Sequence, residues 1–85
     1  MDSSERRCAE TTETIISILE EAIKSEIDSE EKYLHGAELA CDTSVRDFLI
    51  SLARMEHDHK DLLTRQLCEL RAQMKIVEEM NDMFC

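Results

Sequence analysis

The sequence predicts an all-α protein built as a two-helix antiparallel hairpin. Its 85 residues include no proline and one glycine, so few residues interrupt a helix. Two long segments keep their apolar residues at steps of three and four, which is the spacing of one helical face. One short cluster of capping residues, at positions 41–44, separates the two segments. Helices that are joined by so short a connection lie antiparallel.

The first predicted helix runs from about residue 5 to about residue 41. Its apolar stripe consists of Ile15, Ile18, Leu19, Ala22, Glu26, Ser29, Tyr33, Ala37 and Ala40. Gly36 is tolerated inside this helix at a cost of about 1 kcal/mol relative to alanine. The break comes after Cys41, where Asp42, Thr43 and Ser44 are all suited to cap the next helix. Ser44 and Asp47 also resemble a weak capping box.

The second predicted helix runs from about residue 43 to about residue 75. Its stripe consists of Val45, Phe48, Leu49, Leu52, Glu56, His59, Leu63, Leu67 and Leu70. The spacing continues through Met74, Val77 and Phe84, either as the same helix or as a short third helix in a C-terminal extension to residue 85. No repeat or linker divides the chain, so residues 1–85 are expected to form a single domain.

Composition narrows the possible partners. Ten Lys and Arg residues stand against 20 Asp and Glu residues, a formal net charge of −10. This charge argues against binding to nucleic acid or to anionic membrane surfaces, and it attracts cations. No apolar run is long enough to span a membrane, and the N-terminus lacks the apolar core of a signal peptide, so a cytoplasmic location is expected. The four cysteines are widely spaced, without a C-x-x-C pair, and are expected to be free thiols.

Each apolar stripe is interrupted by charge at one place. Glu26 interrupts the first stripe, and Glu56 with His59 interrupts the second. At 1.5 Å per helical residue these positions lie roughly 24, 21 and 26 Å from the turn at Asp42. An antiparallel hairpin therefore brings all three to one level, and the i, i+3 spacing points Glu56 and His59 the same way.

Ionisable groups inside a core need compensation, because an unpaired buried charge costs several kcal/mol. Two arrangements provide it here. One is a divalent metal, since carboxylate oxygen and imidazole nitrogen suit Fe, Mn or Zn. The other is an ion pair within the hairpin between a glutamate and a protonated histidine.

The neighbours of these charges have less specific roles. Glu30 lies one turn beyond Glu26, either exposed to solvent or close enough to guide a metal toward the site. Tyr33 is expected in the core, with its hydroxyl in reach of a ligand carboxylate. His35 and His57 lack comparable partners and are expected at the surface.

The stretch from residue 22 to residue 63 resembles a known family pattern. It reads AIKSEIDSEEKYLHGAELACDTSVRDFLISLARMEHDHKDLL, with Glu26, then Tyr33 seven residues later, then EHDH containing Glu56 and His59. This pattern resembles the rubrerythrins and other ferritin-like proteins, and it looks closest to the encapsulated ferritins, whose subunit is a two-helix half-ferritin. Di-iron bundles use one Glu from each of two helices and one Glu-x-x-His from each of the other two. The chain carries one of each.

The resemblance implies a homodimer that completes a ferritin-like four-helix bundle, within a larger ring of dimers in the encapsulated ferritins. It implies that Glu26, Glu56 and His59 are both the metal ligands and the catalytic residues of a di-iron site shared by two subunits, with one iron per chain and with Zn or Mn as substitutes. Asp28 matches an acidic position near the metal access, which is a weaker correspondence. The implied activity is a ferroxidase that oxidises Fe(II) to Fe(III) for iron storage or detoxification.

The resemblance also raises an encapsulin shell as a partner and a compartment. However, the tail MKIVEEMNDMFC has no glycine-containing apolar signal of the kind that directs cargo into such a shell. Two functions of other classes fit the same residues. One is a non-catalytic module in which Fe or Zn locks a helical dimer, and the other is a structural hairpin in which Glu–His pairs set the register between partners.

Overall fold

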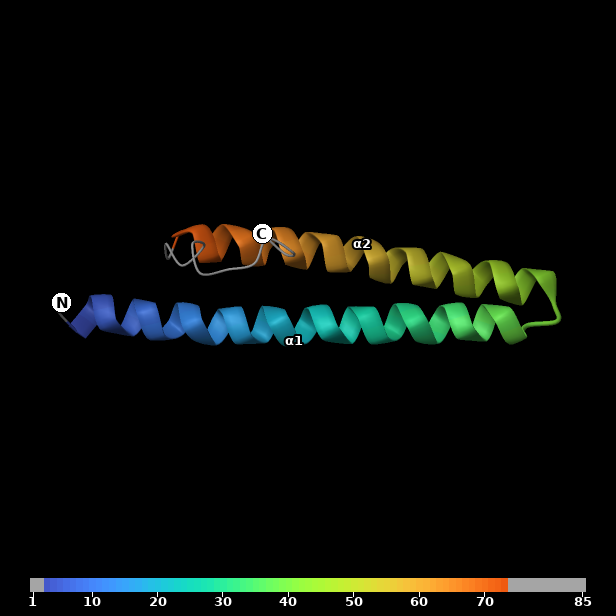
Figure 1. Ribbon diagram of the computed structural model, residues 1–85, viewed down its shortest axis with the longest axis horizontal. Helices are drawn as coiled ribbons and strands as arrows, with labels where there is room; N and C mark the ends of the chain where they lie inside the picture. The colour runs from blue at the N-terminus through green and yellow to red at the C-terminus, as the bar shows by residue number, and fades with distance from the viewer. Residues whose placement is uncertain (1–2, 74–85) are drawn as a thin grey trace.

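The computed structural model describes the backbone of residues 3–73 and the side chains of residues 11–73. It contains α1 (Ser3–Leu39) and α2 (Thr43–Gln73), which run antiparallel along most of their length (Figure 1). The predicted all-α hairpin is confirmed. The proposed C-terminal extension or third helix lies outside the described residues.

The turn is organised by Asp42, one of the three predicted caps. Its Oδ1 accepts hydrogen bonds from the backbone N–H of Ser44 at 2.7 Å and of Val45 at 3.2 Å, which are free donors at the start of α2. The Ser44 hydroxyl also donates to this oxygen, at 2.6 Å. Ser44 therefore supports the cap of Asp42 instead of heading a capping box with Asp47. On the other side of the turn, the Arg46 guanidinium donates to the Ala40 carbonyl at 3.0 Å, close to the end of α1.

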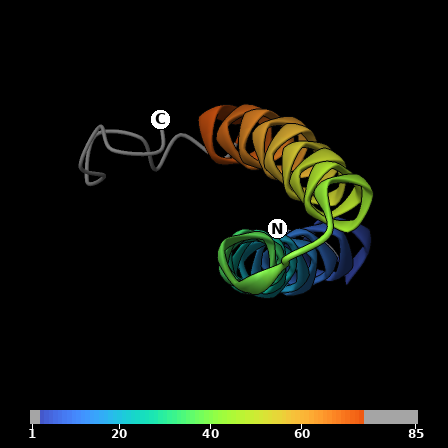
Figure 2. The same cartoon turned by 90° about the vertical axis from the view of Figure 1, so that its right-hand side faces the viewer.

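The two helices pack along one seam. Ile16, Ile23 and Leu67 form the buried cluster near the end of the hairpin that is far from the turn, and Leu19, Ile27, Leu63 and Leu70 pack against it. Ala37 and Ala53 are the buried apolar residues nearer the turn. There the helices lie close together, and a Cβ atom on Gly36 would lie 3.2 Å from Leu49 Cδ1. Seen end-on, the two helices form a single layer and cross obliquely (Figure 2).

A single layer of two helices leaves one broad apolar face uncovered. We call this the open face; its large exposed side chains are Ile15 and Ile18 on α1 and Val45, Phe48, Met55 and Leu62 on α2. The last four step by three or by seven, so they form one stripe on α2. Phe48 is 62% exposed and Ile18 is 57% exposed. The predicted stripes therefore do not lie wholly in the core of the single chain, because Ile15 and Ile18 of the first stripe and Val45, Phe48 and His59 of the second are exposed.

The cysteines also differ from expectation. Cys41 is a free, exposed thiol, as predicted. Cys68 is disulfide-bonded, so the prediction that all the cysteines are free thiols is wrong for this residue. Within the described part of the chain, neither helix has a stretch that is both long and apolar enough to cross a membrane.

Candidate metal centre

Glu26 on α1 and Glu56 with His59 on α2 come together midway along the hairpin. Each offers one ligand atom, and the three atoms all lie within 4.8 Å of one another. Two properties of the sequence bring this about: similar distances from the turn place the three residues at about one level, and the i, i+3 spacing on α2 puts Glu56 and His59 on one face. Among the described residues this is the group of His, Cys, Asp and Glu side chains that could hold a metal ion.

The polar atoms of this cluster are close but incompletely paired. His59 Nδ1 lies 3.7 Å from Glu26 Oε1, which is longer than a hydrogen bond. The other oxygen, Glu26 Oε2, is buried and has no hydrogen-bond partner. A buried carboxylate oxygen without a partner costs about 1–3 kcal/mol or more. Two carboxylates and one imidazole are suitable ligands for Fe, Mn or Zn, so the residues present fit a divalent metal ion.

The pKa of Glu26 also indicates that the cluster has more negative than positive charge around it. The neighbouring Glu56 carboxyl group, with which Glu26 could share a proton, raises the pKa of Glu26 most; burial and the negative charge of Glu56 raise it further. His59 acts in the opposite direction and lowers the pKa of Glu26. A hydrogen bond between two carboxyl groups needs a proton between them, and without that proton the two charges repel. A cation at this position would relieve the repulsion.

The cluster lies at the edge of the open face. His59 follows Phe48, Leu52 and Met55 in the same stripe of α2, and its side chain is 50% exposed. Glu26 follows Ile15, Ile18 and Ala22 in the corresponding stripe of α1, but only 21% of its side chain is exposed. A metal held here would therefore have protein on one side and the open face on the other.

His57 departs from the prediction that it lacks partners. Its Nδ1 lies 3.4 Å from Glu30 Oε2, and its Nε2 lies 3.7 Å from Asp61 Oδ2. The i, i+4 spacing of His57 and Asp61 is the sequence signal that could have revealed the second contact. The two carboxylates approach opposite nitrogens of the ring, so one ion could not be shared by all three side chains. His57 and His35 do lie at the surface as expected, with 49% and 71% of their side chains exposed.

The weaker candidates stand outside the cluster. Glu30 is half-buried and contacts His57, and Asp28 is exposed; neither belongs to the metal-ligand group. Tyr33 is half-buried on the stripe of Glu26, about 10 Å further along α1, and the role of its hydroxyl stays a prediction.

Sequence reasoning also missed the ion pair between Arg71 and Glu20, at 2.6 Å, because two residues 51 positions apart share no local pattern.

Comparison with known families identifies this arrangement. A family model described as rubrerythrin matches residues 5–83, which is nearly the whole chain. The chain belongs to the rubrerythrin family. Rubrerythrins bind di-iron, so the cluster of Glu26, Glu56 and His59 lies in a fold that is used for this purpose. No curated protein and no solved structure showed significant similarity to this rubrerythrin-family chain.

Proposed function

We propose that this protein is a ferroxidase that oxidises Fe(II) at a di-iron site completed by a second copy of the chain. The observation that carries the proposal is the convergence of Glu26, Glu56 and His59 beside the open face, with Glu26 Oε2 buried and unpartnered. One chain supplies half of the ligand set of a di-iron bundle, which needs two glutamates and two Glu-x-x-His pairs. Two chains related by a two-fold axis would supply the whole set.

The open face supports the pairing of two chains. Two large apolar side chains on α1 and four on α2 are exposed along it, and they flank the ligand cluster on both sides. Exposed apolar surface of this extent in a small soluble domain marks an interaction site. A copy of the same chain placed by a two-fold axis presents the same face, so apolar residues meet apolar residues and one ligand cluster meets the other.

The chemistry assigned to the residues is simple. Glu26 and Glu56 would bind Fe(II) as carboxylates, and His59 would bind through a neutral imidazole nitrogen, so occupation of the site releases any proton that they hold. Two Fe(II) ions, the substrates, each give up one electron. Dioxygen takes up both electrons and two protons to give hydrogen peroxide, or hydrogen peroxide takes them up to give two waters. The net charge of −10 would draw Fe(II) toward the protein.

The closer relation to the encapsulated ferritins is part of this proposal. It rests on the position of Tyr33 seven residues after Glu26 and on the EHDH stretch that contains Glu56 and His59. Under this proposal the dimers assemble into a ring, and oxidised iron passes to a separate storage compartment. An encapsulin shell would be such a compartment, and the tail at residues 74–85 offers no recognisable signal for it.

There are two alternatives. One is a non-catalytic module in which Fe or Zn locks the dimer, and the other is a structural hairpin without metal. The contact between His59 and Glu26 is the observation that favours the structural reading. Its length of 3.7 Å weighs against it, because a pair that replaces a metal should close to hydrogen-bond distance.

Anaerobic titration of Fe(II) into the metal-free protein separates these functions, with oxygen admitted afterwards. The ferroxidase predicts saturation near one iron per chain, dimerisation on iron binding, and a ferric absorbance that appears with oxygen. Glu56→Ala should lose all three, and Glu69→Ala, an exposed glutamate on the same helix, should lose none. Binding without oxidation would leave the metal-locked module, and absence of binding would leave the structural hairpin.

A further inference from the structure

The seam between the helices contains a cavity near the end of the hairpin that is far from the turn. We call it the seam cavity; it has a volume of about 220 Å³ and is lined by Glu20, Ile23, Lys24, Ile27, Leu67 and Arg71. Ile23 and Leu67 are buried, so the cavity reaches into the core between the helices. Lys24 lies about 120° around α1 from Ile18, so the rim of the seam cavity and the open face are on different sides of the hairpin.

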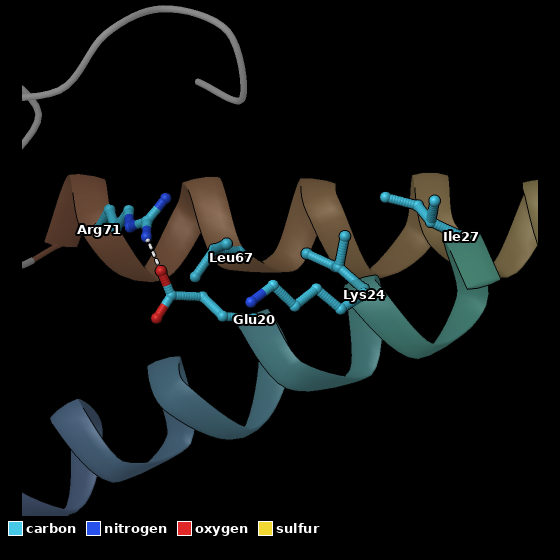
Figure 3. A pocket seen from close by; sticks show the side chains of 6 residues that line it. Glu20, Lys24, Ile27, Leu67 and Arg71 are labelled. Carbon is cyan, nitrogen blue, oxygen red and sulfur yellow. Dashed lines mark hydrogen bonds and ion pairs between the residues drawn. The ribbon is translucent and has the colours of Figure 1, made fainter.

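The charged residues of the seam cavity gather at one end. Arg71 is only 7% exposed, and its Nη2 donates to Glu20 Oε2 at 2.6 Å. Figure 3 shows the Lys24 side chain extending along α1 toward Glu20, which precedes it by one helical turn. Ile27, three residues beyond Lys24, lies at the other end of the cavity (Figure 3). The seam cavity therefore has a charged end and an apolar end, which is the arrangement of a site for an amphiphilic molecule.

The charged end favours a ligand with a single negative charge. Lys24 and Arg71 supply two positive charges and Glu20 supplies one negative charge, so this end is positive although the whole chain carries a net charge of −10. A guanidinium has five N–H donors, and the bond to Glu20 uses one of them. One carboxylate would neutralise the charged end, whereas a doubly charged phosphate would leave an excess of negative charge there.

The volume of the seam cavity limits the size of the ligand. An apolar cavity of about 150 Å³ holds a benzene ring, so 220 Å³ corresponds to roughly nine or ten non-hydrogen atoms. An aliphatic carboxylate with about eight carbons has this size. A helix that docks in a groove inserts several anchor side chains, and a single aromatic ring would already take most of this volume. A small molecule therefore fits the seam cavity better than a segment of a partner protein does.

We propose that the seam cavity binds an aliphatic monocarboxylate with a chain of about eight carbons. The chain would lie against Ile23, Ile27 and Leu67, and the carboxylate would accept hydrogen bonds from Lys24 and Arg71. Because the lining residues come from both helices, the ligand would bind the folded hairpin and stabilise it. The proposal requires neither iron nor a second chain, so it can hold or fail independently of the ferroxidase.

Titration of the full, metal-free protein with octanoate, followed by the NMR signals of assigned methyl groups, tests the site. We expect saturable shifts at the methyls of Ile23, Ile27 and Leu67, and little change at Ile18 on the open face. 1-Octanol has the same chain without the charge, so it should bind at least about tenfold more weakly. Shifts centred on the open face, or equal affinities for octanoate and octanol, would overturn the proposal.

Two charge substitutions test the carboxylate contact separately from the apolar contact. Lys24→Gln should weaken octanoate binding several-fold and leave octanol binding unchanged, whereas Glu20→Gln should strengthen octanoate binding, because it removes a negative charge beside the carboxylate. Lys32→Gln changes an exposed lysine of α1 that does not line the cavity, and it should have no effect. Equal octanoate affinities in the wild type, Lys24→Gln and Glu20→Gln would show that these charges do not hold a carboxylate.

A cavity-filling substitution tests the apolar end. Ile27→Trp places a larger side chain in the seam cavity, so octanoate should raise the melting temperature of the wild type and not that of this variant. Circular dichroism checks that the variant is folded, and Lys24→Gln, a change at an exposed residue, provides the second variant. An equal rise in melting temperature in folded Ile27→Trp would place octanoate elsewhere on the protein and overturn the assignment.

Discussion

At the scale of single residues, a substitution at Glu26 should affect the stability of the metal-free protein and the binding of metal in different ways. Its raised pKa results from the Glu56 carboxyl group and from burial, so the metal-free protein carries a repulsive contact. Glu26→Gln should remove that repulsion and leave the metal-free protein at least as stable toward urea. The same change should weaken Fe(II) binding by at least about 10–100-fold, because loss of a residue that only supports a metal ligand already has an effect of this size.

Urea unfolding and calorimetric titration measure the two effects separately. Glu31→Gln, an exposed change on the same helix, is the matched control and should alter neither. A Glu26→Gln protein that is clearly less stable without metal would show that this carboxylate holds the hairpin together through its contact with His59.

The convergence of Glu26, Glu56 and His59 could be predicted from sequence, because each is an ionisable residue in an apolar stripe at a countable distance from one turn. His57 shows the limit of that reasoning. Its contact with Asp61 follows from the i, i+4 spacing, but its contact with Glu30 depends on how α2 rotates against α1. The pair of Glu20 and Arg71 depends in the same way on packing, so local patterns contain no trace of it.

At the scale of the helices, Gly36 sets the approach of α1 to α2. Alanine at this position gains about 1 kcal/mol of helix propensity. The added Cβ atom would lie 3.2 Å from Leu49 Cδ1, a contact with the end of a flexible side chain that relaxes by a few tenths of an ångström. Gly36→Ala should therefore raise the free energy of unfolding by about 0.5–1 kcal/mol. Gly36→Leu is too large for the same gap and should lower it; equal urea midpoints for the two variants would contradict this account.

Asp42 makes the start of α2 sensitive to pH. Its pKa is lowered by the Ser44 hydroxyl and by the backbone N–H groups of Val45 and Ser44. A carboxyl group whose pKa is lower when folded stabilises the protein above its unfolded pKa, and this contribution is lost as pH falls through the folded pKa. In thermal unfolding, wild type should therefore melt above Asp42→Asn at neutral pH, with the gap closing in acid. Asparagine keeps a capping oxygen without titrating, so a gap that is independent of pH would exclude this cause.

The helix faces were harder to predict than the helices. Steps of three and four identify an apolar arc, but on both helices this arc is wider than one seam can bury. Ile16 and Ile23 are buried on α1, whereas Ile15 and Ile18, next to them in the sequence, remain exposed. A single sequence does not state which part of a wide arc meets the partner helix. The excess width leaves apolar side chains such as Ile18 and Phe48 exposed, which is the surface that the proposed second chain would cover.

At the scale of the whole molecule, the open face should control both assembly and iron binding. Phe48 is 62% exposed on the stripe that leads to His59, so Phe48→Glu places a charge in the proposed interface without disturbing the seam. We expect this variant to stay monomeric in sedimentation at concentrations where the iron-loaded wild type is dimeric, and to bind Fe(II) at least about tenfold more weakly, since half of the ligands would be missing.

Leu39→Glu is the matched control for this variant. Leu39 is 69% exposed and ends α1, away from the stripe of Phe48, so this change should leave assembly and iron binding intact. Removing the metal from the wild type should also weaken the dimer, because two carboxylates from each chain would then repel one another at its centre. If Phe48→Glu dimerises and binds iron like the wild type, the two chains do not meet across the open face, and the proposed site shared across that face is wrong.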